Sequence, residues 1–332
     1  MKYSFDILKT IGNTPLVEIR KMNPNPLVTI LVKLEFYNPT GSIKDRIVLH
    51  IIEDAEKKGL LAPGVTLLES SSGNTGASIA MIAAVKGYRS LVVIPDKVSQ
   101  EKQDLLKAFN AEVIVTKSSA PTDSPEHYNN LITQIVANTP EGFYINQYDN
   151  PKNPEAHYLS TGPEIWEQTG GKVDYFISSG SSGGTISGIG AFLKEQNPHV
   201  KVILADPKGS IYYPYIKTGE FTSEDISSYL MEGIGKDHIP QAMNFSLIDD
   251  VISVTDQEAF YTARRLAQEE GIFGGGSGGA NLWATLQIAK RLKKPATLVT
   301  IIPDSGMKYL SKMYNDEWLK TNHLYLETGF FP

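Results

Sequence analysis

The chain has 332 residues, of which 41% are hydrophobic and 20% charged, and its net charge is −6. This balance is typical of a soluble globular protein with room for two domains, so we expect neither nucleic acid nor an anionic membrane surface as a partner. The chain has no cysteine, which excludes disulfides, a thiol nucleophile and Cys-ligated zinc or haem. No apolar run approaches the roughly 20 residues of a membrane span, and the N-terminus has no signal-peptide core, so we expect a cytoplasmic protein.

Hydrophobic periodicity predicts strands and helices that alternate along the chain. The expected strands are 28–36, 65–69, 90–94, 112–115, 173–178, 200–205, 251–254 and 297–302. The expected helices are 44–58, 77–85, 99–109, 127–136, 184–194, 257–269 and 280–292. Residues 146–158 read as a loop, and 206–250 as the least regular region. The alternation predicts an α/β fold with mostly parallel twisted sheets flanked by helices, in which ligands bind at the carboxyl ends of the strands.

The stretch around Lys44 is the strongest functional signal. The turn 38–41 leads directly into a helix, and Ser42 with Asp45 predicts a capping box at its start. Lys44 then lies in the first helical turn, where the helix dipole disfavours a cation. A lowered pKa would leave a free amine that can attack a carbonyl. The alternative is a solvated lysine near a helix start.

Three loops before predicted helices are rich in glycine, serine and threonine, at 70–76, 178–185 and 274–279. Free backbone N–H groups at a helix N-terminus bind anions, and the hydroxyls add uncharged donors. The loop 178–185 is the best phosphate site, and Asn74 in the first loop could recognise a second polar group. Tight turns that need positive φ are the alternative explanation for each loop.

Two other motifs occur in the chain. The spacing Gly274-x-Gly276-x-x-Gly279 fits the dinucleotide fingerprint, but a convincing strand before it and an acidic residue after it are missing. The run 180–184 matches the G-x-S-x-G elbow of serine hydrolases, with Ser182 as nucleophile. That reading needs a later acid and histidine, for which the candidates are Asp206, Asp304, His238 and His323. The histidines show no metal-binding spacing, so no metal is expected.

With these motifs in place, the chain resembles the cysteine synthase / cystathionine β-synthase family of fold-type II pyridoxal-phosphate enzymes, which are similar to tryptophan synthase β. The resemblance extends from Ile11-Gly12-Asn13-Thr14-Pro15-Leu16 to Pro303-Asp304-Ser305. It implies a large cofactor-binding domain, residues 1–43 plus 149–332, and a smaller mobile domain, residues 44–148. It also implies pyridoxal 5′-phosphate as cofactor and a homodimer.

The resemblance assigns roles to individual residues. Lys44 would form the Schiff base with the cofactor and act as the base for the substrate Cα proton. The other implied cofactor-binding residues are Asn74, Ser181, Ser182, Gly183, Gly184, Thr185, Ser277, Pro303 and Asp304. The implied substrate-binding residues are Ser71, Ser72, Asn74, Thr75, Gln147, Tyr148, Tyr158, Glu232 and Gly233.

The implied reaction is β-replacement on an L-serine-type substrate through an aminoacrylate, followed by addition of a thiol. A neutral Ser277 at the pyridine nitrogen favours this over transamination. The pair Glu232 and Asp237 resembles cystathionine β-synthase, which joins serine and homocysteine in transsulfuration and cysteine biosynthesis. The alternatives are a cysteine synthase, using O-acetylserine and sulfide, or a synthase of another β-substituted alanine.

Two loops depart from the family pattern. The phosphate loop is usually Gly-Thr-Gly-Gly-Thr and begins here with Ser181-Ser182, and the substrate loop has Ser70-Ser71 where the family has Pro-Thr. Both changes keep hydroxyls, so they bear on substrate preference more than on cofactor use. Longer animal-type members add a haem segment and regulatory modules, for which we expect no room after residue 319.

Overall fold

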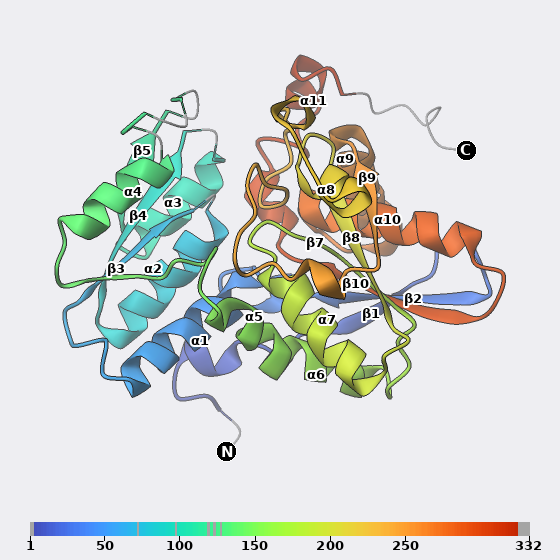
Figure 1. Cartoon of the computed structure of the whole chain (residues 1–332), viewed down its shortest axis with the longest axis horizontal. Coiled ribbons are helices and arrows are strands. Elements are labelled where there is room, and N and C mark those ends of the chain that lie inside the picture. Colours follow the sequence, from blue (N-terminus) through green and yellow to red (C-terminus); the bar gives the residue numbers. More distant parts are fainter. Residues whose placement is uncertain are drawn as a thin grey trace.

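The structure is a computed structural model that describes residues 3–324 except 72, 97, 118–119, 122–123 and 127. Its strands form two sheets that lie side by side (Figure 1). The larger sheet, in spatial order, contains β1 (Leu16–Ile19), β2 (Val28–Leu34), β10 (Ala296–Ile302), β7 (Tyr175–Ser179), β8 (Lys201–Pro207) and β9 (Asp250–Val254). The smaller sheet contains β5 (Glu112–Thr116), β4 (Arg89–Pro95), β3 (Thr66–Ser70) and β6 (Gly142–Tyr144).

Neighbouring strands in both sheets are parallel, apart from the antiparallel pair β1 and β2. Parallel neighbours need crossover connections, which here are mostly helices. The helices are α1 (Lys44–Lys57), α2 (Asn74–Lys86), α3 (Gln100–Ala108), α4 (Tyr128–Ala137), α5 (Lys152–Ala156), α6 (Gly162–Gln168), α7 (Gly184–Gln196), α8 (Tyr212–Thr218), α9 (Asp256–Arg265), α10 (Gly276–Arg291) and α11 (Asp316–Thr321). The predicted α/β class with mostly parallel sheets flanked by helices is confirmed.

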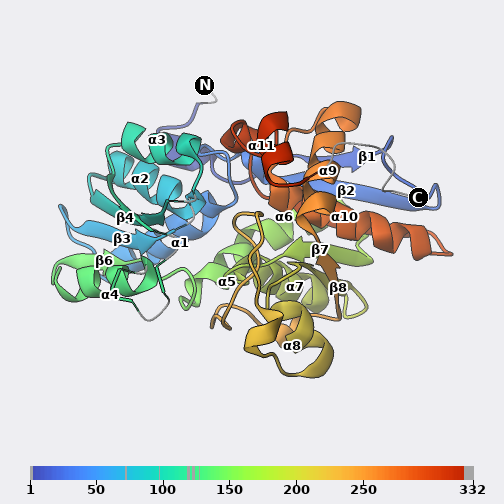
Figure 2. The same cartoon turned by 90° about the horizontal axis from the view of Figure 1, so that it is seen from above.

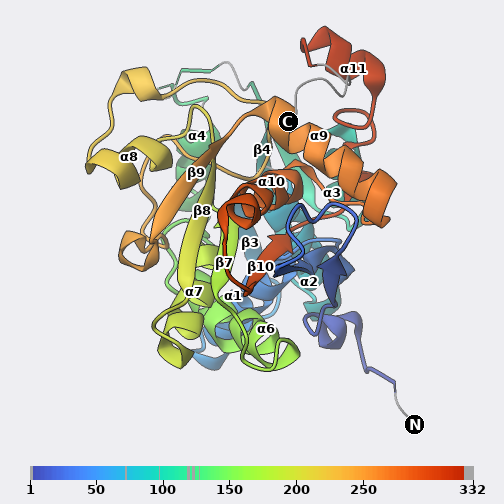
Figure 3. The ribbon, with the colours of Figure 1, turned by 90° about the vertical axis from the view of Figure 1, so that its right-hand side faces the viewer.

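Strand β8 shows why both faces of the larger sheet are covered. Ile203 and Ala205 pack into one hydrophobic cluster with α9 and α10, whereas Val202 and Leu204 pack into another with α6 and α7. Successive side chains of a strand point to opposite faces, so an unbroken apolar run needs a cover on each side. Figures 2 and 3 show α9 and α10 on one side of this sheet and α7 on the other.

The smaller sheet is covered in the same way. Helices α1, α2 and α3 pack on one face, while α4 covers the other through Ile132, which contacts Leu68 and Val93. All of these elements come from the predicted smaller domain, residues 44–148. The division into two domains, and the mobility of the smaller one, stay predictions. No helix in the described ranges is long and apolar enough to cross a membrane.

Several element predictions need correction. Residues 146–158, expected as a loop, contain α5, and a π-helical turn (His157–Thr161) continues it into α6. Pro154 does not prevent this, because the N–H that it lacks would have no partner in the first helical turn. The irregular region 206–250 contains α8, and β1 and β6 were not predicted.

Candidate active site

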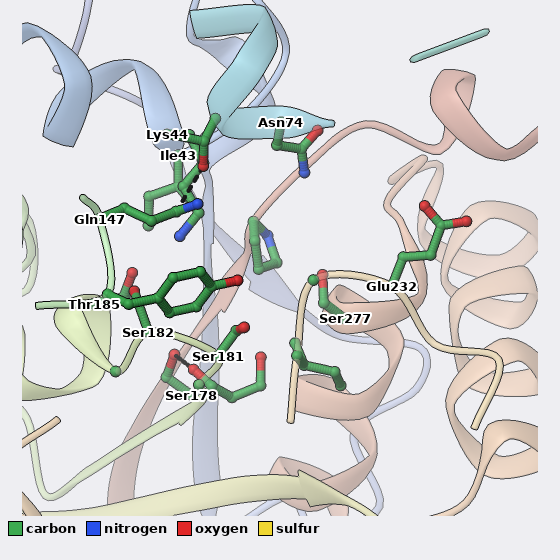
Figure 4. A pocket seen from close by; sticks show the side chains of 18 residues that line it. Ile43, Lys44, Asn74, Gln147, Ser178, Ser181, Ser182, Thr185, Glu232 and Ser277 are labelled. Carbon is green, nitrogen blue, oxygen red and sulfur yellow. Dashed lines mark hydrogen bonds between the residues drawn. The ribbon is translucent and has the colours of Figure 1, made fainter. Parts of the chain in front are cut away.

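One pocket lies between the two sheets, where strands end and helices begin (Figure 4). It collects residues from the starts of α1, α2, α7 and α10 and from the segment that follows β6. The lining residues are Ile43, Lys44, Asn74, Thr75, Gln147, Tyr148, Ser178, Ser179, Gly180, Ser181, Ser182, Gly183, Thr185, Glu232, Gly233, Ile234, Ser277 and Pro303. The structure therefore brings most of the predicted site residues into one pocket.

Lys44 is the first residue of α1, as predicted. The backbone before it is tied to the end of β10, because Ile43 N–H donates to the Pro303 carbonyl (2.8 Å). The predicted capping box is absent: Asp45 instead accepts hydrogen bonds from Thr40 and Ser78. These contacts hold the first turn of α1 against α2 and orient the lysine toward the pocket.

The Lys44 ammonium forms no hydrogen bond or ion pair with any described residue. Burial lowers the pKa of Lys44 to about 8, although the Asp304 carboxylate acts in the opposite direction. The pKa of Lys44 is therefore lowered, as predicted. The main cause is burial, whereas the sequence suggested the helix dipole. At neutral pH a useful fraction of this amine is uncharged.

The loop between β7 and α7 is shaped as an anion cradle. Gly183 has φ +82°, and a Cβ there would lie 2.6 Å from Met243 Cβ. At Gly184 a Cβ would lie 1.9 Å from Asn153 Oδ1, so neither position has room for a side chain. The first-turn N–H groups of α7 have no intrahelical partners and are free to bind an anion. Residues 180–185 contain no carboxylate, so the loop fits a phosphate.

The hydroxyls of this loop contact neighbouring helices. Ser182 Oγ accepts a hydrogen bond from Asn153 Nδ2 (2.9 Å), and Thr185 Oγ1 lies 3.1 Å from His157 Nε2. Burial holds the pKa of His157 well below its usual value, and its other ring nitrogen meets Thr161 (2.9 Å). Ser182 has no histidine partner among the described residues, so the structure does not assemble the hydrolase triad. Asn153 was missed because the Asn/Pro-rich segment was expected as a loop.

Ser277 lies in the first turn of α10 and lines the pocket. Its hydroxyl forms no hydrogen bond with a described residue, which leaves it free for a ligand. The helix was predicted to begin at residue 280 because glycine is a poor helix former. The glycines are present for close packing, since a Cβ at Gly279 would lie 2.0 Å from the Ala259 carbonyl oxygen in α9.

Asn74, the first residue of α2, is held by two partners across the pocket. Its Nδ2 donates to Asp304 Oδ2 (2.7 Å), and its Oδ1 accepts from Lys308 Nζ (2.7 Å). Tyr309 also donates to Asp304 (2.6 Å). Burial lowers the pKa of Lys308 to about 8, while Asp304 acts in the opposite direction. This network fixes the amide of Asn74. Nothing in the sequence distinguished Lys308 from a surface lysine.

Some of the residues predicted to bind the substrate carboxylate line the pocket, and others do not. Thr75 Oγ1 donates to Gln147 Oε1 (2.7 Å), and both line the pocket with Tyr148. Ser71 is turned toward the start of α2, where its Oγ accepts from the N–H groups of Gly73 and Gly76. Ser72 lies outside the described residues.

Of the three remaining predicted substrate residues, two line the pocket and one does not. Glu232 and Gly233 line the pocket, and each Glu232 carboxylate oxygen is paired with a lysine, Lys102 at 2.7 Å and Lys312 at 2.6 Å. The structure does not bring Tyr158 to this pocket, since its hydroxyl donates to Glu195 and its ring packs edge-on to Phe192. Gly184 and Asp304 do not line the pocket, but Asp304 accepts a hydrogen bond from the lining residue Asn74, and Gly184 lies against Asn153.

Residues 7–304 match the family described as "Pyridoxal-phosphate dependent enzyme". The chain is 43% identical over 318 residues to a cystathionine beta-synthase of Apis mellifera, covering 95% of this chain and 62% of the relative. It is 38% identical over 321 residues to cysteine synthase 1 of Emericella nidulans, covering 96% and 86%. A crystal structure of O-ureido-L-serine synthase superposes with a TM-score of 0.86 at 34% identity, covering 96% and 100%. The chain spans about three fifths of the length of the first cystathionine beta-synthases that it matches.

Proposed function

The chain belongs to the family of pyridoxal-phosphate dependent enzymes, and from that premise we propose that it replaces the β-hydroxyl of L-serine with a thiol. Its cofactor is pyridoxal phosphate, and it is a β-replacing enzyme of the cystathionine β-synthase and cysteine synthase type. We propose serine and homocysteine as the substrate pair, with cystathionine and water as the products. A homodimer and a place in transsulfuration belong to the same proposal.

The residues present fit the cofactor. Lys44 would tether it, the N-terminus of α7 with Ser182 and Thr185 would hold its phosphate, and Ser277 would meet its ring nitrogen. The amide of Asn74 would bind its phenolic oxygen. When bound, the cofactor withdraws electrons from the substrate Cα, which makes the Cα proton acidic and lets the β-substituent leave.

The observation that carries the proposal is the unpaired amine of Lys44 in the same pocket as the anion cradle and the free Ser277 hydroxyl. Because its pKa is lowered to about 8, this amine can accept a proton near neutral pH. After substrate displaces it from the cofactor, Lys44 would take the Cα proton. The same group would then return a proton when the thiol has added.

The start of α2 would bind the substrate carboxylate. The backbone N–H groups of Asn74 and Thr75 and the amide nitrogen of Gln147 are the donors that would bind it, and the Thr75 hydroxyl holds the Gln147 amide in place. The side chain of Gln147 is oriented by Thr75, and its backbone N–H donates to Glu69 (3.1 Å). This arrangement would fix the direction in which the Cα proton points toward Lys44.

Residues at the start of α3 contact segments that belong to the larger sheet's side of the pocket. These contacts support a closure of the smaller domain over the substrate. Ser99 Oγ donates to the Lys308 carbonyl (2.9 Å), and Lys102 reaches Glu232. Glu101 accepts hydrogen bonds from Ser311 (2.9 and 3.0 Å). Closure through these contacts would exclude water and so limit hydrolysis of the reactive intermediate.

Mass spectrometry of reaction products tests the proposal. Serine or O-acetylserine is supplied with either homocysteine or sulfide, and Lys44→Gln is the matched inactive control. We expect cystathionine from serine and homocysteine with the native enzyme and none with the variant. Cysteine as the sole product would support the cysteine synthase alternative, which the 86% coverage of the Emericella nidulans relative favours. No product from any pair would contradict β-replacement.

A further inference from the structure

A second cavity adjoins the first and extends toward the segment 226–237. It has a volume of about 640 Å³, and Tyr148, Ser181 and Glu232 are among the residues that line both cavities. A molecule in the second cavity therefore faces the pocket of Lys44. Trp318 and Met231 give this cavity an apolar side.

Lys236 lines the second cavity and is the feature that the proposed reaction has not used. Its side chain is buried, with 7% of the residue exposed, and Nζ lies 4.1 Å from the ring centroid of Tyr148. The backbone on each side is fixed, because Lys236 N–H donates to Ser210 Oγ and its carbonyl accepts from Ile211 N–H. The ammonium forms no hydrogen bond or ion pair with a described residue.

A buried ammonium with no hydrogen-bonding partner is costly unless a ligand or water supplies one. The other lysine of this wall differs, since Lys312 is paired with Glu232 at 2.6 Å. The cation–π contact with Tyr148 compensates only part of the lost hydration. The geometry thus leaves one cation available to an anion that enters the cavity.

Two acidic groups near Lys236 are already engaged. The Asp237 carboxylate, whose pKa is lowered mainly by its contact with His238 (2.8 Å), is close enough to be affected by the charge of Lys236. Glu69 is buried behind Ser70 and Gln147 and accepts both of their N–H groups. Burial raises the pKa of Glu69 to about 8, so it is mostly uncharged at pH 7. Neither acid forms an ion pair with Lys236.

We propose that Lys236 binds the carboxylate of the second substrate in this cavity and so selects an amino-acid thiol over sulfide. The inference rests on the proposed β-replacement and names the class of its nucleophile. The shared wall at Tyr148 and Ser181 would let the thiol end of such a molecule reach into the first pocket while its carboxylate stays at Lys236.

Two thiols that differ only by a carboxylate test this assignment. Homocysteine and 3-aminopropane-1-thiol are compared as nucleophiles with serine, for the native enzyme and for Lys236→Gln and Lys236→Arg. A charge-assisted hydrogen bond predicts that the ratio of kcat/KM for homocysteine over the aminothiol falls roughly tenfold to a hundredfold in Lys236→Gln. Lys236→Arg should retain most of the ratio. An unchanged ratio in Lys236→Gln would overturn the proposal.

A binding measurement tests the role of Lys236 even if the enzyme shows no turnover. Homoserine and 3-aminopropan-1-ol, which cannot react as thiols, are titrated against native and Lys236→Gln holoenzyme while tryptophan fluorescence is followed, since Trp318 lines the cavity. A preference for homoserine that is lost in Lys236→Gln supports the proposal even if no product forms, in which case only the β-replacement proposal has failed. A preference that Lys236→Gln keeps belongs to the carboxylate site at the start of α2 and contradicts the role of Lys236. Equal binding of the two would contradict the role of Lys236.

Discussion

Lys308 donates a hydrogen bond to the side-chain oxygen of Asn74 at 2.7 Å, which forces the amide nitrogen toward Asp304 and the pocket. The contact joins the turn Gly306–Tyr309, which follows β10 of the larger sheet, to the start of α2 beside the smaller one. An amide can rotate to exchange its donor and acceptor, and a cation on one side removes that freedom. Lys308 is therefore a positioning residue for the group expected to meet the cofactor.

Removing this cation should weaken cofactor binding. For Lys308→Met we expect the dissociation constant of pyridoxal phosphate to rise roughly tenfold, because a charged hydrogen bond that orients Asn74 is lost. Equilibrium dialysis with detection of the bound cofactor measures it. Lys290→Met, at an exposed lysine of α10, is the control. Equal affinity for pyridoxal phosphate in both variants would contradict a positioning role of Lys308.

Cofactor attachment should depend on pH through Lys44. Only the uncharged amine reacts, and its pKa is lowered from 10.5 to about 8, so the uncharged fraction rises as pH increases through about 8. The rate at which cofactor-free protein recovers its visible absorption band should rise with a midpoint near pH 8. Rapid-mixing measurements between pH 6.5 and 10 give this rate on both sides of the expected midpoint. A rate that is still rising steeply near pH 10 would mean an ordinary lysine.

A buried ion network behind Lys44 should control acid stability. Arg46 in α1 pairs with Glu35 and Glu164, and Glu164 also pairs with Lys33, all at 2.7 Å. Burial acts to raise the pKa of Glu164, but Arg46 and Lys33 outweigh it and lower the value to about 2. This carboxylate therefore stabilises the fold above its unfolded pKa of 4.5, and that contribution is lost as pH falls toward 2.

Glu164→Gln should lower the free energy of unfolding by about 3 kcal/mol at pH 7, because Lys33 and part of Arg46 lose their counter-charge. Between pH 4.5 and 2 the difference from the native protein should shrink. Urea denaturation at each pH measures this. Glu167→Gln, at an exposed position of the same helix, should change stability little. A constant difference across this pH range would contradict the account.

Alanine variants of Gly183 and Gly87 distinguish the effect of backbone strain from the effect of the shape of the anion cradle. Both have positive φ, +82° and +78°, but a Cβ meets Met243 only at Gly183, while nothing lies within 4 Å at Gly87. Alanine at either position should cost about 1 kcal/mol of stability from the left-handed backbone, and Gly183→Ala should cost about 1–3 kcal/mol more because its Cβ overlaps Met243. Gly183→Ala alone should also weaken pyridoxal-phosphate binding at least roughly tenfold, since the loop must shift. Equal cofactor affinity in the two variants would argue against the cradle.

The sequence predicted the parts of the fold that depend on local pattern. The run Val202–Ala205 is apolar at every position, so a strand covered on both faces could be inferred before its neighbours were known. The start of α10 could not, because Gly276 and Gly279 are poor helix formers that are present for contacts with α9. The helical path through Pro154 likewise depends on packing against α1 and α7.

The sequence likewise indicated some residues of the candidate site and not others. Lys44 and Asn74 were singled out because each lies beside a helix start with a recognisable loop, and Ser277 was assigned by resemblance. Lys308 and Lys236 were missed, because a single lysine carries no pattern and its importance depends on burial and on which acids lie nearby. Tyr158 was included by resemblance, yet its side chain turns to Glu195.

Reduction of the holoenzyme with borohydride, followed by peptide mapping, identifies the lysine that carries the cofactor. Two buried lysines near the pocket, Lys44 and Lys308, have a pKa near 8, but only Lys44 is free of hydrogen bonds. The account predicts the mass of the reduced cofactor on the peptide that contains Lys44 and on no other. An adduct on Lys308 or elsewhere, or no adduct at all, would contradict it.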